Sequence, residues 1–299
     1  APRKKHEFWG SRIFIKFLTA PLMILPLSLS LSAGELLGIA IYYLWQSRRR
    51  IAIKAVEETF AYLKRAFPEK AEHWKVPHEI VKAMFKNLGR SFVELVRIYW
   101  GDEEVFRRIR FRGLEVFERA KQKGKGIIFL TGHCGNWELM AIAFGRKVEP
   151  IGVVARPLNS KGLNSLIEEI RTGHGNHVIY KKGAVREILR DLRDNRAVGI
   201  LMDQSVLRQE GLLIDFLGRP AWTSRMPALI ARKTEAVVLP AFIKRDGDGH
   251  LVEIFQEVEL TGDEEEDTKR LSSFIERYII ENPEEWLWIH RRWKRRDVA

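Results

Sequence analysis

The spacing of apolar residues divides the chain into a helical first part and an alternating second part. Over residues 48–65 and 78–99, apolar side chains recur every three or four positions, which predicts two amphipathic helices. From about residue 110, short β-branched runs alternate with helical patterns instead. Buried parallel strands separated by helices produce this alternation. The pattern therefore predicts an α/β fold, with a mostly parallel sheet flanked by helices on both faces.

The alternating part can be divided into individual elements. Short apolar runs predict strands at residues 126–131, 149–155, 177–180, 197–203 and 236–243, with another at 249–260 after a "DGDG" turn. Helical patterns predict helices at residues 137–146, 161–172, 184–194, 225–234 and about 267–281. No Pro/Gly/Ser-rich linker interrupts the chain. We expect a helical lead-in over residues 48–108 that continues into an α/β core over 109–299.

Residues 1–47 are mostly apolar and have basic residues at both ends. The apolar stretch is long enough to cross a bilayer, although Lys16, Pro21, Pro26 and Glu35 interrupt it. Because both flanks are basic, the positive-inside rule gives no clear direction. We expect a membrane anchor, either a single span or a broken hairpin lying in the interface. A pair of buried core helices is the alternative.

Charge and cysteine content narrow the classes of function. The 51 Lys and Arg residues exceed the 39 Asp and Glu residues, so the formal net charge is +12. This balance favours an anionic partner, and nucleic acid, an anionic lipid surface and an acidic protein all qualify. The single cysteine, Cys134, excludes an intramolecular disulfide framework and a multi-cysteine metal site.

Polar residues follow four of the predicted strands. They are His133 and Glu138, then Arg156, then Lys181 and Lys182, and finally Asp203 and Gln204. In open α/β sheets, reactive groups gather where strands end and the chain turns into a helix. We therefore expect these side chains to be neighbours in space.

The segment "HCGNWE" suggests a specific chemistry. Histidine is the natural general base near neutral pH, and a carboxylate on its far ring nitrogen fixes the tautomer. The glycine permits a tight turn that brings Glu138 back to His133, and Asn136 between them is expected to support the site or bind substrate. No serine nucleophile in a G-x-S-x-G elbow accompanies the pair. The implied reaction is deprotonation of a bound hydroxyl, which attacks an activated acyl carbonyl.

A metal site and a cysteine nucleophile are the other interpretations of this segment. A metal site is disfavoured, because neither H-E-x-x-H nor a third ligand occurs at a suitable spacing. Cys134 could be a nucleophile beside a histidine. Adjacent residues on an extended turn usually point apart, however, and a lone cysteine is more often a packing residue.

Several segments resemble one protein family in an ordered set. These are "GKGIIFLTGHCGNWEL", "RPLNSKGLNSLIEEIR", "GAVREILRDLRDNRAVGILMDQS", "FLGRPAWTSRMPALIARKTEAVVLPAF" and "NPEEWLWIHRRWKRR". They look like the bacterial lipid A biosynthesis acyltransferases, the late acyltransferases related to lauroyl and myristoyl transferases. The similarity runs from about residue 80 to residue 296. Mycobacterial acyltransferases of mannosylated phosphatidylinositol share the His-x4-Glu pattern more distantly, and glycerolipid acyltransferases carry His-x4-Asp in a related fold.

The resemblance implies a glycerolipid-acyltransferase-like fold, an acyl carrier protein as donor, and a hydroxyl of a phosphorylated glycolipid, the lipid A precursor, as acceptor. It implies no metal and no organic cofactor. His133 would be the general base and Glu138 its orienting partner. Arg156 and Asp203 match family residues important for the site: Arg156 would hold Glu138 or an acceptor phosphate, and Asp203 would orient the arginine. An internal salt bridge is the alternative for Arg156 and Asp203.

The combined expectation is a membrane-associated O-acyltransferase at the cytoplasmic face of the bacterial inner membrane. Members of the family often carry an asparagine five residues before a Phe-Pro pair, and Tyr62 stands at that spacing here, so the chain departs from the family pattern at this position. A lysophospholipid or another glycolipid is the alternative acceptor. A noncatalytic lipid- or nucleic-acid-binding protein is a more distant alternative. Nucleic acid is not expected as a partner, because the basic, aromatic tail "WLWIHRRWKRR" has no accompanying nucleic-acid motif.

Overall fold

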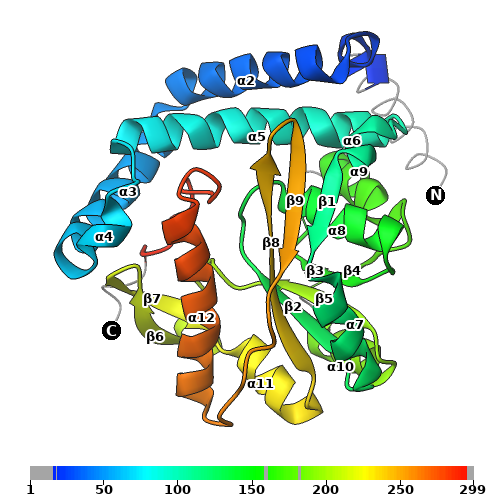
Figure 1. Cartoon of the computed structure of the whole chain (residues 1–299), viewed down its shortest axis with the longest axis vertical. Helices are drawn as coiled ribbons and strands as arrows, with labels where there is room; N and C mark the ends of the chain where they lie inside the picture. The colour runs from blue at the N-terminus through cyan, green and yellow to red at the C-terminus, as the bar shows by residue number, and fades with distance from the viewer. Residues whose placement is uncertain (1–15, 18, 158–160, 181–182, 295–299) are drawn as a thin grey trace.

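A mixed sheet forms the centre of the computed structural model, which describes residues 16–17, 19–157, 161–180 and 183–294. Among these residues the sheet has seven strands (Figure 1). Across the sheet they are β1 (Ile109–Arg112), β9 (Gly249–Ile254), β8 (Val237–Asp246), β2 (Ile127–Thr131), β5 (Ala197–Leu201), β3 (Gly152–Ala155) and β4 (His177–Tyr180). Neighbouring strands are parallel except for β8 and β9. The predicted α/β fold with a mostly parallel sheet is confirmed.

Helices cover both faces of this sheet. One face packs against α7 (Leu114–Gln122), α8 (Trp137–Lys147) and α9 (Lys161–Thr172), and the other against α10 (Ala184–Arg193), α11 (Met226–Thr234) and α12 (Glu264–Glu281). Strand β2 shows why, because its residues are buried on both sides. Ile127 and Phe129 belong to the hydrophobic cluster on the α8 face, and Ile128 and Leu130 to the cluster on the α12 face. Because successive residues of a strand point to opposite faces, β2 contributes side chains to the hydrophobic core on each side of the sheet.

The helical first part lies along one end of the sheet. It consists of α2 (Leu27–Leu44), α3 (Gln46–Ala66), α4 (Pro68–Ala71), α5 (Pro77–Tyr99) and α6 (Glu104–Arg107). Helix α2 lies along α5, and α5 separates it from the sheet (Figure 1). The two helices touch through their backbones, because a Cβ at Gly38 would overlap the Phe85 carbonyl oxygen and a Cβ at Gly89 would overlap that of Gly34. Small residues are therefore required at this crossing.

The outer side of α2 is apolar and exposed. Its large exposed side chains are Leu29, Leu36, Leu37, Tyr43 and Leu44. Among the described residues, α2 is the one helix long and apolar enough to cross a membrane, and 28% of its residues are buried inside the protein. The expected apolar anchor segment therefore contains a suitable helix, although residues 1–15 and 18 lie outside the described residues.

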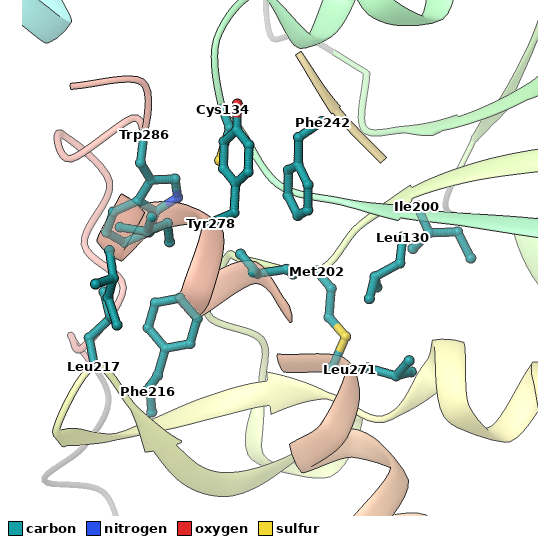
Figure 2. Packing of buried hydrophobic residues seen from close by; sticks show 14 of the residues in the cluster. Leu130, Cys134, Ile200, Met202, Phe216, Leu217, Phe242, Leu271, Tyr278 and Trp286 are labelled. Atoms are coloured by element: carbon teal, nitrogen blue, oxygen red, sulfur yellow. The ribbon is translucent and has the colours of Figure 1, made fainter. Parts of the chain in front are cut away.

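A β-hairpin and the C-terminal segment lie on the α12 side of the protein. The hairpin consists of β6 (Gly211–Phe216) and β7 (Arg219–Ser224), preceded by a short 3-10 turn, η1 (Arg208–Glu210). Phe216 packs against Trp286, with ring centroids 5.7 Å apart (Figure 2). Trp286 and Trp288 are buried almost completely. The segment after α12 is thus part of the core, and its aromatic side chains are not free for a partner.

The structure also differs from the predicted elements at several places. The predicted strand over 249–260 ends at Ile254, because the following residues leave the β8–β9 ladder. The strand predicted at 236–243 continues to Asp246. Strand β1, helix α7 and the β6–β7 hairpin were not predicted. Their sequences mix charged and apolar residues, as in "IRFR", and carry no long apolar run.

Candidate active site

The turn that carries His133 is fixed by the chain around it. Gly135 has a φ of +58°, and a Cβ at this position would overlap the carbonyl oxygen of Ile243. The N–H of Gly135 donates to the Glu285 carbonyl at 2.9 Å. Cys134 forms a β-bridge with Trp286. Only glycine fits where the turn passes between the sheet and the C-terminal segment, so the position of His133 is set by backbone contacts.

Strand register places His133 beside Asp203. Thr131 pairs with Leu201 at the carboxyl ends of β2 and β5, and two further residues along each chain lead to His133 and Asp203. The imidazole Nδ1 lies 2.8 Å from Asp203 Oδ1. The indole N–H of Trp286 donates to the second oxygen, Oδ2, at 2.8 Å. When Nδ1–H donates to this carboxylate, Nε2 carries the free lone pair, as a general base requires.

His133 and Asp203 shift each other's pKa through their charges and their hydrogen bond. Burial alone would lower the pKa of the His133 imidazole, but the charge of Asp203 and the hydrogen bond to it outweigh burial and raise that pKa. Burial alone would raise the pKa of the Asp203 carboxyl, but His133 and the Trp286 N–H hold it well below its usual range. Asp203 is therefore ionised at neutral pH and stabilises the imidazolium that forms when His133 accepts a proton.

Gln204 contacts the other side of the imidazole. Its amide nitrogen lies 3.1 Å from Nε2 of His133. With Nδ1–H bonded to Asp203, this amide donates to the Nε2 lone pair. A substrate hydroxyl that gives its proton to Nε2 would replace the amide at this position, so Gln204 marks where the reacting group binds.

Glu138 does not pair with His133 in the structure, which corrects the expected orienting role. Its carboxylate accepts two hydrogen bonds from Arg171, from Nε to Oε2 at 2.7 Å and from Nη2 to Oε1 at 2.6 Å. Trp137 Nε1 donates to the same carboxylate at 3.2 Å. Glu138 is the second residue of α8, where it meets Arg171 of α9, and Nδ1 of His133 is already bonded to Asp203. The bidentate ion pair fixes Arg171 next to the site.

The structure contradicts one of the two roles expected of Arg156, that of holding Glu138, and the role of binding an acceptor phosphate stays a prediction. Arg156 is exposed after β3 and lines the cavity beside His133, but it is Arg171 that binds Glu138. Asp203 bonds His133 and Trp286, so it does not orient an arginine. Lys181 and Lys182 lie outside the described residues. Arg171 and Trp286 were missed in the sequence analysis, because an arginine late in an amphipathic helix and a tryptophan in a basic tail are common features.

The remaining residues of "HCGNWE" have structural contacts. The side chain of Asn136 accepts the N–H of Leu139 at 3.1 Å as the N-cap of α8, and its amide donates to Glu94 at 2.7 Å. Cys134 is buried, and burial raises the pKa of its thiol well above the usual value. A thiol in that state is a poor nucleophile, so the geometry favours packing over catalysis for Cys134.

A cavity of about 830 Å³ opens beside His133. Apolar residues dominate its wall and include Phe129, Met140, Phe144, Val153, Leu201 and Ile230. Its size lies in the range of small-molecule and cofactor sites, roughly 300–1,000 Å³. The described residues contain no group of three or more potential metal ligands. The site thus places a histidine, bonded to a carboxylate, in the wall of a cavity whose other lining suits a hydrocarbon chain.

The chain is similar in sequence to known acyltransferases. The sequence model described as bacterial lipid A biosynthesis acyltransferase matches residues 3–295. The chain is 26% identical over 245 residues to a lipid A biosynthesis palmitoleoyltransferase of Escherichia coli (strain K12), covering 79% of this chain and 78% of that protein. It is 23% identical over 297 residues to a lipid A biosynthesis acyltransferase of Haemophilus influenzae, covering 95% and 87%. A phosphatidylinositol mannoside acyltransferase of Mycolicibacterium smegmatis is 24% identical over 224 residues, covering 73% of each chain.

Proposed function

The chain belongs to the bacterial lipid A biosynthesis acyltransferase family, and from this premise we propose that it transfers a fatty acyl chain from acyl carrier protein to a hydroxyl of a lipid A precursor, with His133 as general base. The observation that carries the proposal is His133, bonded to Asp203, in the wall of an apolar cavity. The pair supplies a proton acceptor, and the cavity supplies space for the acyl chain.

The proposed reaction needs no covalent intermediate on the protein. The acceptor hydroxyl binds at Nε2 of His133, in the place of the Gln204 amide. As its oxygen attacks the thioester carbonyl carbon, the proton passes to Nε2, and Asp203 stabilises the imidazolium. The C–S bond then breaks, and the imidazolium returns the proton to the leaving thiolate. The products are an ester and the free thiol of the donor.

Glu138 and Arg171 would act on the same step through charge. Their bidentate pair joins the start of α8 to α9. Arg171 is fixed in position before substrate binds, so its cation needs no rearrangement to interact with negative charge that develops on the thioester oxygen. Glu138 is therefore proposed as a positioning residue for Arg171, and His133 as the catalytic base.

Charge and apolar surface support the proposed partners. The net charge of +12 suits acyl carrier protein, which is acidic, and a phosphorylated glycolipid. The exposed apolar side of α2 supports attachment to a membrane. We place the protein at the cytoplasmic face of the inner membrane, where a cytoplasmic donor and a membrane lipid meet.

A second candidate acceptor is a different glycolipid. It is favoured by the similarity to a phosphatidylinositol mannoside acyltransferase, which covers 73% of this chain at 24% identity. The His133–Asp203 chemistry would be the same, so only the acceptor distinguishes the two proposals.

The test is acyl transfer in detergent from labelled acyl carrier protein. A lipid A precursor, a mannosylated phosphatidylinositol and a lysophospholipid would be supplied in parallel. We expect transfer to the lipid A precursor, reduced by about 10² or more in His133→Ala and by about tenfold in Glu138→Gln, which keeps the shape of the side chain but removes the negative charge that holds Arg171 in place. Circular dichroism would show that the variants are folded. Transfer to none of the three acceptors, or full activity without His133, would overturn the proposal.

A further inference from the structure

The cavity beside His133 passes between two strands of the sheet. β3 and β5 pair only at Gly152 with Val198 and at Val153 with Gly199. Each strand continues with its other neighbour, β3 as far as Ala155 and β5 as far as Leu201. Residues 153–155 and 199–201 all line the cavity. Because successive residues of a strand face opposite sides, one cavity with this lining reaches both faces of the sheet.

The two sides of the cavity differ in how closed they are. On the α8 side, the inner compartment is lined by Phe129, Phe144, Val153 and Val252, which are all less than a tenth exposed. On the other side, the α10–α11 groove is lined by Val185, Leu189, Met226 and Leu229. Val185 is 52% exposed, and the other three are half-buried. The inner compartment is therefore lined by buried residues, whereas the α10–α11 groove is partly open to solvent.

A buried hydroxyl without a hydrogen-bond partner and several cations line the same cavity. Ser205 lines the cavity next to Gln204, and its Oγ is buried without a hydrogen-bond partner among the described residues. A buried hydroxyl without a partner is costly and points to a polar group that binds there. Arg156, Arg225 and Lys233 also line the cavity, the last two from α11 and its N-cap, and Arg225 contacts Glu264 at 3.1 Å. These cations suit an amphiphile with phosphate groups.

We propose that the α10–α11 groove binds a hydrocarbon chain of the acceptor, with Ser205 hydrogen-bonded to a polar group beside the reacting hydroxyl. The donor's acyl chain then occupies the inner compartment. A donor chain has a free methyl end and can enter a buried compartment end first. An acceptor with a headgroup and further chains fits only a groove that is partly open to solvent. The inference rests on the proposed acyl transfer and adds that a chain of the acceptor binds on the opposite face of the sheet from the donor chain.

Kinetic measurements on variants distinguish the binding site of the acceptor's hydrocarbon chain from that of the donor's acyl chain. Leu189→Trp and Leu229→Trp place bulk in the α10–α11 groove, and Gly199→Leu places bulk on the inner side. A Cβ at Gly199 has its nearest neighbour, Ile151 Cδ1, at 3.8 Å, so the backbone accommodates a side chain. Leu213→Trp is the control, because Leu213 is a partly exposed leucine on the hairpin that does not line the cavity. KM values for acceptor and for acyl carrier proteins with different chain lengths would be measured in detergent.

We expect both groove variants to raise the acceptor KM by about tenfold or more, with the donor chain-length preference retained. Ser205→Ala should raise the acceptor KM about fivefold, the effect of one hydrogen bond. Gly199→Leu should shift donor preference to shorter chains. If the groove variants shift donor preference instead, or if they behave like Leu213→Trp, the groove assignment is wrong. Absence of transfer by the unmodified protein would overturn the proposed function itself, so the two failures are distinguishable.

Discussion

Among the histidine–carboxylate pairs of the protein, those of His133 and His250 differ in access. His133 Nδ1 lies 2.8 Å from Asp203, and His250 Nε2 lies 2.9 Å from Glu94. Both carboxylates are buried to nearly the same degree. The His133 side chain is 20% exposed in the cavity wall, however, whereas that of His250 is 3% exposed. Only the first pair presents a ring nitrogen to a space where a substrate fits.

The second pair is completed by other parts of the chain. Arg245 donates to Glu94 at 2.7 Å, and Asn136 donates to its other oxygen at 2.7 Å. The cluster therefore joins α5 to β8, β9 and the cap of α8. The same two chemical groups serve as a base where one ring nitrogen is open to substrate, and as a buried connection where an arginine neutralises the carboxylate. The exposure of the imidazole and the presence of an arginine on the carboxylate therefore determine which of the two roles a pair has.

The largest effect is expected at Asp203. In Asp203→Asn the amide cannot stabilise an imidazolium and can favour the wrong tautomer of His133. We expect kcat to fall about 10³-fold or more, while the protein stays folded by circular dichroism. His250→Gln is the matched variant in the buried pair, and its rate per folded molecule should fall far less. Equal losses in the two variants would mean that exposure at the cavity does not separate the pairs.

Glu94→Gln should affect stability more than rate. Burial alone would raise the pKa of Glu94, but Arg245 and His250 lower it from 4.5 to about 2. A lowered folded pKa means that this stabilisation is present above pH 4.5 and is lost as pH falls through about 2. The shift corresponds to roughly 3 kcal/mol. Urea unfolding at pH 7 should show a loss of this order in Glu94→Gln, and the variant should lack that part of the acid dependence.

The pH profile tests the pair at the cavity. His133 must be neutral to accept a proton, and Asp203 raises its pKa above the ordinary 6.5. Activity of the unmodified protein should therefore rise with pH through a midpoint above 6.5, as the imidazolium loses its proton. In Asp203→Asn the acid limb should move to lower pH, because the neighbouring negative charge is absent. An unmoved acid limb would show that another group controls the rate.

Much of the sheet can be predicted from sequence, because β2, β5 and β8 are buried runs without charges in their centres. Strand β1 reads "IRFR" at the edge of the sheet, and its arginines leave no apolar run to detect. The β6–β7 hairpin similarly contains Asp215, Arg219 and Pro220. Local hydrophobicity therefore predicts the strands that are apolar runs, including the edge strand β4, whereas β1 and the hairpin depend on tertiary packing.

In the candidate site, too, the residues with a local sequence signal were predicted, and the contacts that depend on tertiary packing were not. His133 was recognisable because polar residues follow a buried strand at a glycine turn. Its partner was not, because nearness in sequence favoured Glu138. The contact with Asp203 depends on β5 lying beside β2, and strand order has no local signal. Arg171, 33 residues after Glu138, likewise becomes its partner only when α9 packs on α8.

The smallest effect is expected at Cys134, the residue next to His133 in sequence. Its thiol is buried against the C-terminal segment, and burial raises its pKa, so it is protonated at neutral pH. Cys134→Ala should reduce stability by about 1 kcal/mol through a small cavity and leave kcat nearly unchanged. A thiol-blocking reagent should leave the activity of the native protein intact. A loss of about 10² in Cys134→Ala, with the fold retained, would instead indicate covalent catalysis by the thiolate. It would also remove His133 from the role of base for the acceptor hydroxyl, because the histidine would then activate the cysteine.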